Sequence, residues 1–578
     1  MLHKVYLVAV VIASHGILRS AAYDQATSPA CKYIPGDSGW PRAKAWAEFN
    51  STVGGKLVAP RQLASVCHNP NYNETACAYI QEQWTSPFLH DESSSSIMAA
   101  AVADEDCDPF TSREMPCKAG DSVTYSVKAT DAMDIMKTLA FARANNIRLV
   151  IRNTGHDYLG KSTGKWALSI WTHYMKDTKY LSAYKSPRYS GPAMKVGAGI
   201  QVEDAYRAAH SYNHLVVGGD CASVGVAGGY LQGGGHSALS SMYGMGADNV
   251  LEWEVIDGTG RLLIASPERN ADLYWALSGG GGGTYGIVVS VTVKLHPDTP
   301  MTGVQLQFDL DEHQPEAFRS AVRQYHELVP VFTAAPFYGM AIAEITNTTF
   351  QLLPLTLPNV PRQNAEKLMA PLIQVLSKHD MPYSLNITSS SSWLDHWLQL
   401  IKPNPTQLVQ NAQYGGWIVP REVFDRNSSA LDSAIQDITK AGCVFVGLAL
   451  NVSQSGLSPN QNSIRPSWRS AMMNTILSTN WPEGANLNDM RALAKTMTET
   501  CVPALSKLAP DAGAYLNEAD PNQPDWQHAF YGENYDRLLS VKTKYDPYHL
   551  FYAPTAVGSD FYKIDDSGRL CRSGVNYM

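Results

Sequence analysis

The sequence predicts a two-domain α+β protein, and three observations support this fold class. The chain has 578 residues, 44 % apolar and 17 % charged, a composition that supplies a large core and excludes disordered and collagen-like proteins. At about 100–200 residues per domain, this length corresponds to two or more domains. Strand and helix signals alternate from about residue 117, and their character changes near Pro297.

The N-terminus has the pattern of an export signal. Lys4 supplies a positive charge, Val5 to Leu18 form an apolar stretch, and Ser20-Ala21-Ala22 offers small residues for cleavage. The stretch is shorter than the roughly 20 apolar residues of a spanning helix. We therefore predict a signal peptide at 1–22 and a secreted protein with no membrane partner. Sequons for N-linked glycans occur at Asn50, Asn73, Asn347, Asn386, Asn427 and Asn451.

Cysteine usage agrees with an oxidising compartment. The nine cysteines are Cys31, Cys67, Cys77, Cys107, Cys117, Cys221, Cys443, Cys501 and Cys571. Eight can form four disulfides, and the short Cys67/Cys77 and Cys107/Cys117 spacings favour local loops. None has the paired CxxC spacing of a zinc site, so no metal is predicted. We expect Cys221 to be unpaired because it alone lies in a glycine-rich motif; the alternative is a buried thiol without a chemical role.

The elements follow one another in an α+β order. Residues 23–116, rich in Ser, Pro and Cys, are predicted to wrap the body as an extended segment. Apolar spacing then predicts strands at 122–127, 148–152, 250–257, 261–265, 287–295 and 304–310, and helices at 131–145, 202–210 and 316–328. Asp257-Gly258-Thr259-Gly260 is a hairpin signal. The predicted units are 117–298, 299–510 and a tail at 511–578 that returns to the first domain.

The charge balance excludes one class of partner. Lys+Arg number 45 and Asp+Glu 53, giving a net charge of −8 without a basic block. Phosphate binding needs concentrated Lys and Arg. We therefore expect no nucleic-acid partner.

Glycine clusters mark a candidate ligand site. Runs at 218–219, 225–229, 233–235 and 279–283 lie within about one domain length of one another. Backbone N–H groups in such loops can hold a pyrophosphate. Neither a Rossmann GxGxxG after the first strand nor a P-loop is present. A dinucleotide bound by another scheme is the remaining interpretation, with ordinary loop glycines as its alternative.

Three motifs carry a family resemblance. Arg152-Asn153-Thr154-Gly155-His156-Asp157-Tyr158, then Cys221-Ala222-Ser223-Val224-Gly225-Val226-Ala227-Gly228-Gly229, and finally Tyr545-Asp546-Pro547-Tyr548-His549-Leu550-Phe551 resemble the berberine bridge enzyme-like branch of the vanillyl-alcohol oxidase/p-cresol methylhydroxylase flavoproteins, in particular fungal isoamyl alcohol oxidase-like proteins. The resemblance implies a split FAD-binding domain (117–298 with 511–578) and an α+β substrate domain (299–510) built on an antiparallel sheet.

The resemblance also assigns cofactor-binding residues. His156 is expected to carry the flavin on its 8α-methyl carbon, and Cys221 to bond flavin C6, giving bicovalent FAD. The other expected contacts are Arg152, Asn153, Thr154, Gly155, Asp157, Tyr158, Ser223, Gly225, Gly228, Gly229, Gly283, Ile287 and Val289. For His156 the alternative is a structural loop histidine, and for Cys221 a flavin attached through histidine alone.

The catalytic assignments depend on a departure from the family. Relatives that oxidise oligosaccharides place a Tyr after the Asn of a Tyr-x-Asn-Tyr-x-Asp element, whereas this chain has Tyr515-Leu516-Asn517-Glu518-Ala519-Asp520. We predict Glu518 as the base or its orienting group, with Asn517 fixing flavin or substrate. The alternative is a Glu with purely structural hydrogen bonds. Val224 stands where oxygen-reactive relatives often carry Val, which favours O2 as acceptor; an ordinary packing Val is the alternative.

These observations predict a secreted FAD-dependent oxidase. Its small-molecule substrate is an alcohol, oxidised with molecular oxygen to a carbonyl product and H2O2. Two alternatives remain: oxidative cyclisation or dehydrogenation of a secondary metabolite by the same flavin, and a flavoprotein without enzymatic activity.

Overall fold

The computed structural model describes residues 30–99, 107–118, 120, 122–456 and 459–574. The predicted signal peptide lies outside these residues. The N-terminal segment contains α1 (Ala43–Thr52), β1 (Leu57–Val58), α2 (Glu74–Gln83) and α3 (Pro87–Asp91). Disulfides Cys67–Cys77 and Cys107–Cys117 close loops within it, as the spacing predicts, and Cys31–Cys571 links it to the end of the chain.

A four-stranded sheet begins the first domain. Its order is β1-β2-β4-β3, with β2 (Tyr125–Lys128), β4 (Leu168–Trp171) and β3 (Leu149–Arg152) parallel to one another. Helix α4 (Ala132–Ala144) covers it, and the Asp131 carboxylate caps the helix by accepting the N–H of Asp134. Apolar residues of α1 and α4 share one core with β2, β3 and β4.

A five-stranded antiparallel sheet completes this domain. It consists of β5 (Thr178–Ser186), β6 (Tyr189–Gly197), β10 (Ile287–Lys294), β8 (Val250–Ile256) and β9 (Leu262–Ala265), in that order. Nearby are α5 (Val202–His210), α6 (Ser240–Tyr243), α7 (Ala271–Leu277) and the short pair β7 (His214–Leu215) with β11 (His296–Pro297). The predicted hairpin joins β8 to β9, and Asp257 accepts the N–H groups of Thr259 and Arg261.

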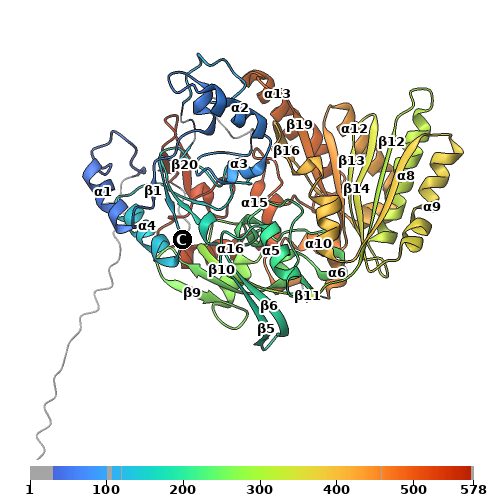
Figure 1. The fold of residues 1–578 in the computed structure, drawn as a ribbon, viewed down its shortest axis with the longest axis horizontal. Coiled ribbons are helices and arrows are strands. Elements are labelled where there is room, and N and C mark those ends of the chain that lie inside the picture. The colour runs from blue at the N-terminus through green and yellow to red at the C-terminus, as the bar shows by residue number, and fades with distance from the viewer. Residues whose placement is uncertain (1–29, 100–106, 119, 121, 457–458, 575–578) are drawn as a thin grey trace, which may run out of the picture.

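The second half is an eight-stranded antiparallel sheet, as the α+β prediction requires (Figure 1). Its strands are β12 (Met301–Asp309), β13 (Met340–Ile345), β14 (Thr349–Pro358), β15 (Tyr383–Ser390), β16 (Ala412–Gly415), β17 (Ile418–Pro420), β18 (Val444–Ala449) and β19 (Ala471–Asn480). Its helices are α8 (Pro315–Phe332), α9 (Arg362–Lys378), α10 (Trp393–His396), α11 (Arg421–Arg426), α12 (Ser428–Lys440), α13 (Leu487–Thr496) and α14 (Val502–Ser506). Helices α8, α9 and α12 cover one face, which leaves the opposite face for the site described below (Figure 1).

The C-terminal segment packs on the first domain. It contains α15 (Trp526–Tyr531), α16 (Tyr535–Tyr545) and the hairpin of β20 (Tyr562–Ile564) and β21 (Leu570–Arg572). The buried Lys542 ammonium donates to the Asp546 carboxylate and to the carbonyls of Thr284 and Phe551. Cys443–Cys501 is the fourth disulfide, and Cys221 is free. Within the described ranges, no helix is long and apolar enough to cross a membrane.

Candidate functional site

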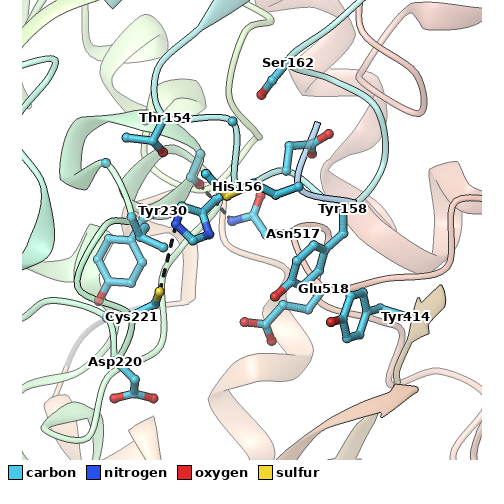
Figure 2. A pocket seen from close by; sticks show the side chains of 18 of the residues that line it. Thr154, His156, Tyr158, Ser162, Asp220, Cys221, Tyr230, Tyr414, Asn517 and Glu518 are labelled. Carbon is cyan, nitrogen blue, oxygen red and sulfur yellow. Dashed lines mark hydrogen bonds between the residues drawn. The ribbon is translucent and has the colours of Figure 1, made fainter. Parts of the chain in front are cut away.

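A cavity of about 560 Å³ lies between the first domain and the open face of the large sheet. One wall comes from loops that follow β3 and α5, where the predicted motifs are. The opposite wall comes from β13, β16, β18 and β19, and the segment 515–518 reaches the cavity from the C-terminal side. Figure 2 shows His156 and Cys221 on one side and Tyr414 and Glu518 on the other.

His156 and Cys221 come together although 65 residues separate them. The Cys221 Sγ lies 3.9 Å from His156 Nε2 (Figure 2). The Ser223 hydroxyl lies 2.7 Å from the same nitrogen. Burial, with smaller effects from the neighbouring His90 and Arg152, lowers the pKa of His156 to about 4. The imidazole is therefore neutral, and one ring nitrogen keeps a free electron pair. Burial raises the pKa of Cys221, so its resting form is the thiol.

Glycines let the loops of this wall pack closely beside this pair. A Cβ atom on Gly225 would lie 2.5 Å from the Asn153 amide, and one on Gly282 would lie 3.2 Å from the Gly229 Cα. Gly283 has φ +69°, a backbone conformation that residues with a side chain rarely adopt. The Asn153 Oδ1 is buried without a partner among the described residues. These glycines, the unpaired amide oxygen and the adjacent His156 and Cys221 fit FAD.

Glu518 forms the centre of a polar cluster in the cavity. Its Oε1 lies 2.7 Å from His236 Nε2, and its Oε2 accepts the Asn474 amide at 2.9 Å. Burial disfavours a charged His236, but the Glu518 carboxylate outweighs that effect and raises the pKa of His236. Burial also raises the pKa of the nearby Asp220 to about 6. The arrangement can accept and hold a proton beside His156 and Cys221.

Asn517 fixes the loop that carries Glu518. Its amide donates to the Gly229 carbonyl and to the Tyr515 hydroxyl, both at 2.8 Å. The Tyr515 hydroxyl also accepts the N–H of Gly235. The C-terminal segment is thereby held against the glycine-rich loop of the first domain.

Most predicted site residues line this one cavity. They are Asn153, Thr154, Gly155, His156, Asp157, Tyr158, Cys221, Val224, Gly225, Gly228, Gly229, Gly283, Asn517 and Glu518. The Asp157 carboxylate accepts backbone N–H groups of Leu159 and Lys161, which shapes the His156 loop. Tyr158 stacks on Tyr414, with ring centroids 4.3 Å apart.

Four predicted cofactor contacts do not line the cavity. The Arg152 guanidinium is buried behind the loop and donates to the carbonyls of His90 and Thr154. Ser223 contacts the site only through its hydroxyl, which forms a hydrogen bond with His156 Nε2. Ile287 and Val289 face the other core, because side chains alternate along β10, and Val288 lines the cavity instead.

The sequence did not identify several cavity residues. Asp220 directly precedes Cys221 in the chain, and this position beside the motif could have identified it as a cavity residue. Glu344 and Tyr414 line the cavity, and Asn474 contacts it only through its hydrogen bond to Glu518; all three come from strands of the large sheet that carry no motif. His173 and Tyr174 lie outside the cavity lining and contact Glu92 of the N-terminal segment.

Comparisons with known proteins agree with this geometry. A family model described as "FAD binding domain" matches residues 123–266, and one described as "Berberine and berberine like" matches 514–558. The FAD-linked oxidoreductase patO of Aspergillus clavatus is 56 % identical over 542 residues, 94 % of each chain. The patO protein of Penicillium expansum is 53 % identical over 546 residues, 94 % of this chain and 95 % of that protein.

A solved structure extends the likeness to the whole fold. The VAO-type flavoprotein MtVAO615 from Myceliophthora thermophila C1 superimposes with a TM-score of 0.89 at 38 % identity, over 94 % of this chain and 100 % of that chain. Both halves of the molecule and the C-terminal segment therefore have counterparts in a known flavoprotein. The chain belongs to the berberine bridge enzyme-like branch of the vanillyl-alcohol oxidase family and is an FAD-linked oxidoreductase.

Proposed function

We propose that this protein is a secreted oxidase that converts an alcohol and O2 into a carbonyl compound and H2O2, with FAD attached to His156 and Cys221. The observation that carries the proposal is the Glu518–His236 pair, which opens into the same cavity as those two side chains. An alcohol bound there meets a proton acceptor and the cofactor together.

The bound FAD supplies the hydride acceptor of this reaction. Glu518 supports the step by accepting the hydroxyl proton of the alcohol. Each carboxylate oxygen has two lone pairs, so one acceptor position stays open on each oxygen after the bonds to His236 and Asn474. Those two partners also fix the carboxylate plane. General base catalysis of this kind typically contributes about 10²–10⁴-fold.

Ser223 supports attachment of the flavin to His156, and Val224 supports O2 as the electron acceptor. The Ser223 hydroxyl contacts His156 Nε2 and so orients the imidazole, and Nδ1 would then be the nitrogen free to hold the flavin. Val224 lines the cavity three residues after Cys221. Its short side chain leaves O2 a path to the flavin.

Secretion and glycosylation belong to the same proposal. Four disulfides are typical of proteins from an oxidising compartment. Five of the six sequons are exposed or half-buried. Asn451 is only 3 % exposed and its side chain accepts bonds from Ser453, so it is not a glycan site. Glycosidase treatment of secreted protein, followed by intact mass, tests this part.

Product analysis tests the reaction. The holoprotein is incubated in air with primary and secondary alcohols, with 2-naphthalenemethanol as reference. We expect a carbonyl product and H2O2 in equal amounts, since R–CH2OH and O2 give R–CHO and H2O2. A product with a new ring bond and no carbonyl would support oxidative cyclisation instead. Photoreduced flavin that stays bleached in air would contradict an oxidase.

A further inference from the structure

The sheet wall of the cavity has an apolar centre. Alternate residues of β13, β18 and β19 point into it, as expected for one face of a sheet: Ile342, Glu344, Val444, Val446, Leu448, Ile476 and Ser478. Aliphatic side chains occupy the middle of this wall. Such a surface favours an apolar ring or chain over a sugar, whose hydroxyls would lack partners there.

Glu344 interrupts this apolar wall. It lies on β13 with Val446 opposite it on β18, and its carboxylate is half-buried. Burial raises the pKa of Glu344, and no charged or hydrogen-bonding neighbour in the described part of the chain offsets that effect. A carboxylate that has lost part of its contact with water and has no partner is stabilised by a ligand that supplies a donor.

The strand register places Glu344 relative to the catalytic cluster. Glu344, Val446 and Ile476 form one cross-strand row, and Ile342, Leu448 and Asn474 form the next row on the same face. With about 4.8 Å between strands and about 7 Å between alternate residues, the Cα atoms of Glu344 and Asn474 lie roughly 12 Å apart. Asn474 holds Glu518. The two carboxylates therefore lie at opposite ends of the apolar centre.

We propose that Glu344 forms a distal subsite for a hydrogen-bond donor, so that the substrate is an uncharged, largely apolar alcohol with a second hydroxyl at the far end of its scaffold. This inference rests on the proposed alcohol oxidation at Glu518. A scaffold of two fused six-membered rings with a substituent at each end is comparable in length with the roughly 12 Å estimated between the Cα atoms of Glu344 and Asn474. Anionic substrates are disfavoured, because Asp220, Glu344 and Glu518 all line the cavity, whereas Lys161 is the single Lys or Arg among the described residues that line it.

A rigid pair of probes tests the subsite. The probes are 2-naphthalenemethanol and 6-hydroxy-2-naphthalenemethanol, which differ by one distal hydroxyl. Their Kd values are measured from the shift in flavin absorption on the holoenzyme, and turnover is measured separately. The variants are Glu344→Leu, which removes the acceptor, and Glu344→Gln, which keeps the shape. Glu252→Gln is the matched control, a half-buried carboxylate on β8 outside the cavity whose pKa is also raised by burial.

We expect the dihydroxy probe to bind the parent protein at least about tenfold more tightly, the size of one hydrogen bond to a charged group. Glu344→Leu should abolish the difference, Glu344→Gln should reduce it, and Glu252→Gln should preserve it. Equal affinities in the parent protein, no spectral response to either probe, or a preference that survives in Glu344→Leu would overturn the subsite. Tight dihydroxy binding without turnover would count against the alcohol oxidation and leave the subsite standing. Turnover of both probes with equal affinities would support the alcohol oxidation and count against the subsite.

Discussion

Glu518 Oε1 lies 2.7 Å from Nε2 of His236, although the two residues are 282 positions apart in the chain. The contact joins the C-terminal segment to the glycine-rich loop of the first domain, at the point where the large sheet closes the cavity. Because the imidazole is paired with the carboxylate, the two groups act as one proton-holding unit. Four predictions about this unit, its surroundings and the C-terminal segment follow, and a fifth concerns the flavin tether.

Glu518→Gln should lower turnover at least about 100-fold, because an amide cannot take the hydroxyl proton that a carboxylate accepts. The flavin should remain attached, since the side-chain hydrogen bonds of Glu518 go to His236 and Asn474 and not to His156 or Cys221. Turnover with the reference alcohol and the visible spectrum of denatured protein check both parts. The variant Glu312→Gln, which changes an exposed carboxylate in the same way, serves as control. Near-normal turnover of Glu518→Gln would remove this residue from the mechanism.

Asp220→Asn should move the acid limb of the kcat/KM profile to lower pH by about one unit. Burial raises the pKa of Asp220 to about 6, and its negative charge raises the pKa of His236. Removing that charge lowers the pKa of His236, so the imidazole of the Glu518–His236 pair stays neutral to a lower pH. A pH profile measured from pH 4 to 9 checks this. An acid limb that stays in place or moves upward is the contrary result.

Val224→Leu should slow reoxidation of the reduced flavin by O2 about tenfold, or about 1.4 kcal/mol in barrier. The additional methylene fills space in the cavity wall that Val224 leaves open. Stopped-flow mixing of photoreduced protein with aerated buffer measures this rate. Flavin reduction by the alcohol serves as the internal control and should change less. An unchanged reoxidation rate would show that Val224 is an ordinary packing residue.

Lys542→Ala should reduce the free energy of unfolding by about 3–5 kcal/mol, because it leaves the buried Asp546 carboxylate without its cation. The neighbouring Lys544 offers a matched control. Its pair with Asp272 is exposed, so Lys544→Ala should cost at most about 1 kcal/mol. Chemical denaturation of the three proteins compares them. Equal losses for both variants would contradict this role of the buried pair.

The motif half of the site could be predicted from the sequence, because its residues are close neighbours in loops whose glycines are visible in the chain. His156, Cys221 and Glu518 were all predicted and all line one cavity. Helix α5 also has the predicted bounds, since its apolar spacing and its ends are local features.

The sheet half of the site could not be predicted. Glu344 and Asn474 are 130 residues apart, and only the order of strands β13, β18 and β19 brings their rows together. The direction of the side chains along β10 could not be predicted from the sequence for a related reason. Ile287 and Val289 were assigned to the cofactor, but the pleat of β10 turns Val288 to the cavity, and that parity depends on tertiary packing.

In the proposed function, attachment to His156 and Cys221 fixes the orientation of the flavin, and the proposed catalytic roles depend on that orientation. The direct measurement is to denature the purified protein in acid, separate small molecules, and record the absorption spectrum of both fractions for the parent protein, His156→Ala and Cys221→Ala. We predict that flavin colour stays with the parent chain, and that each single variant keeps one bond and a shifted spectrum. Yellow colour in the small-molecule fraction of the parent protein would contradict the covalent attachment.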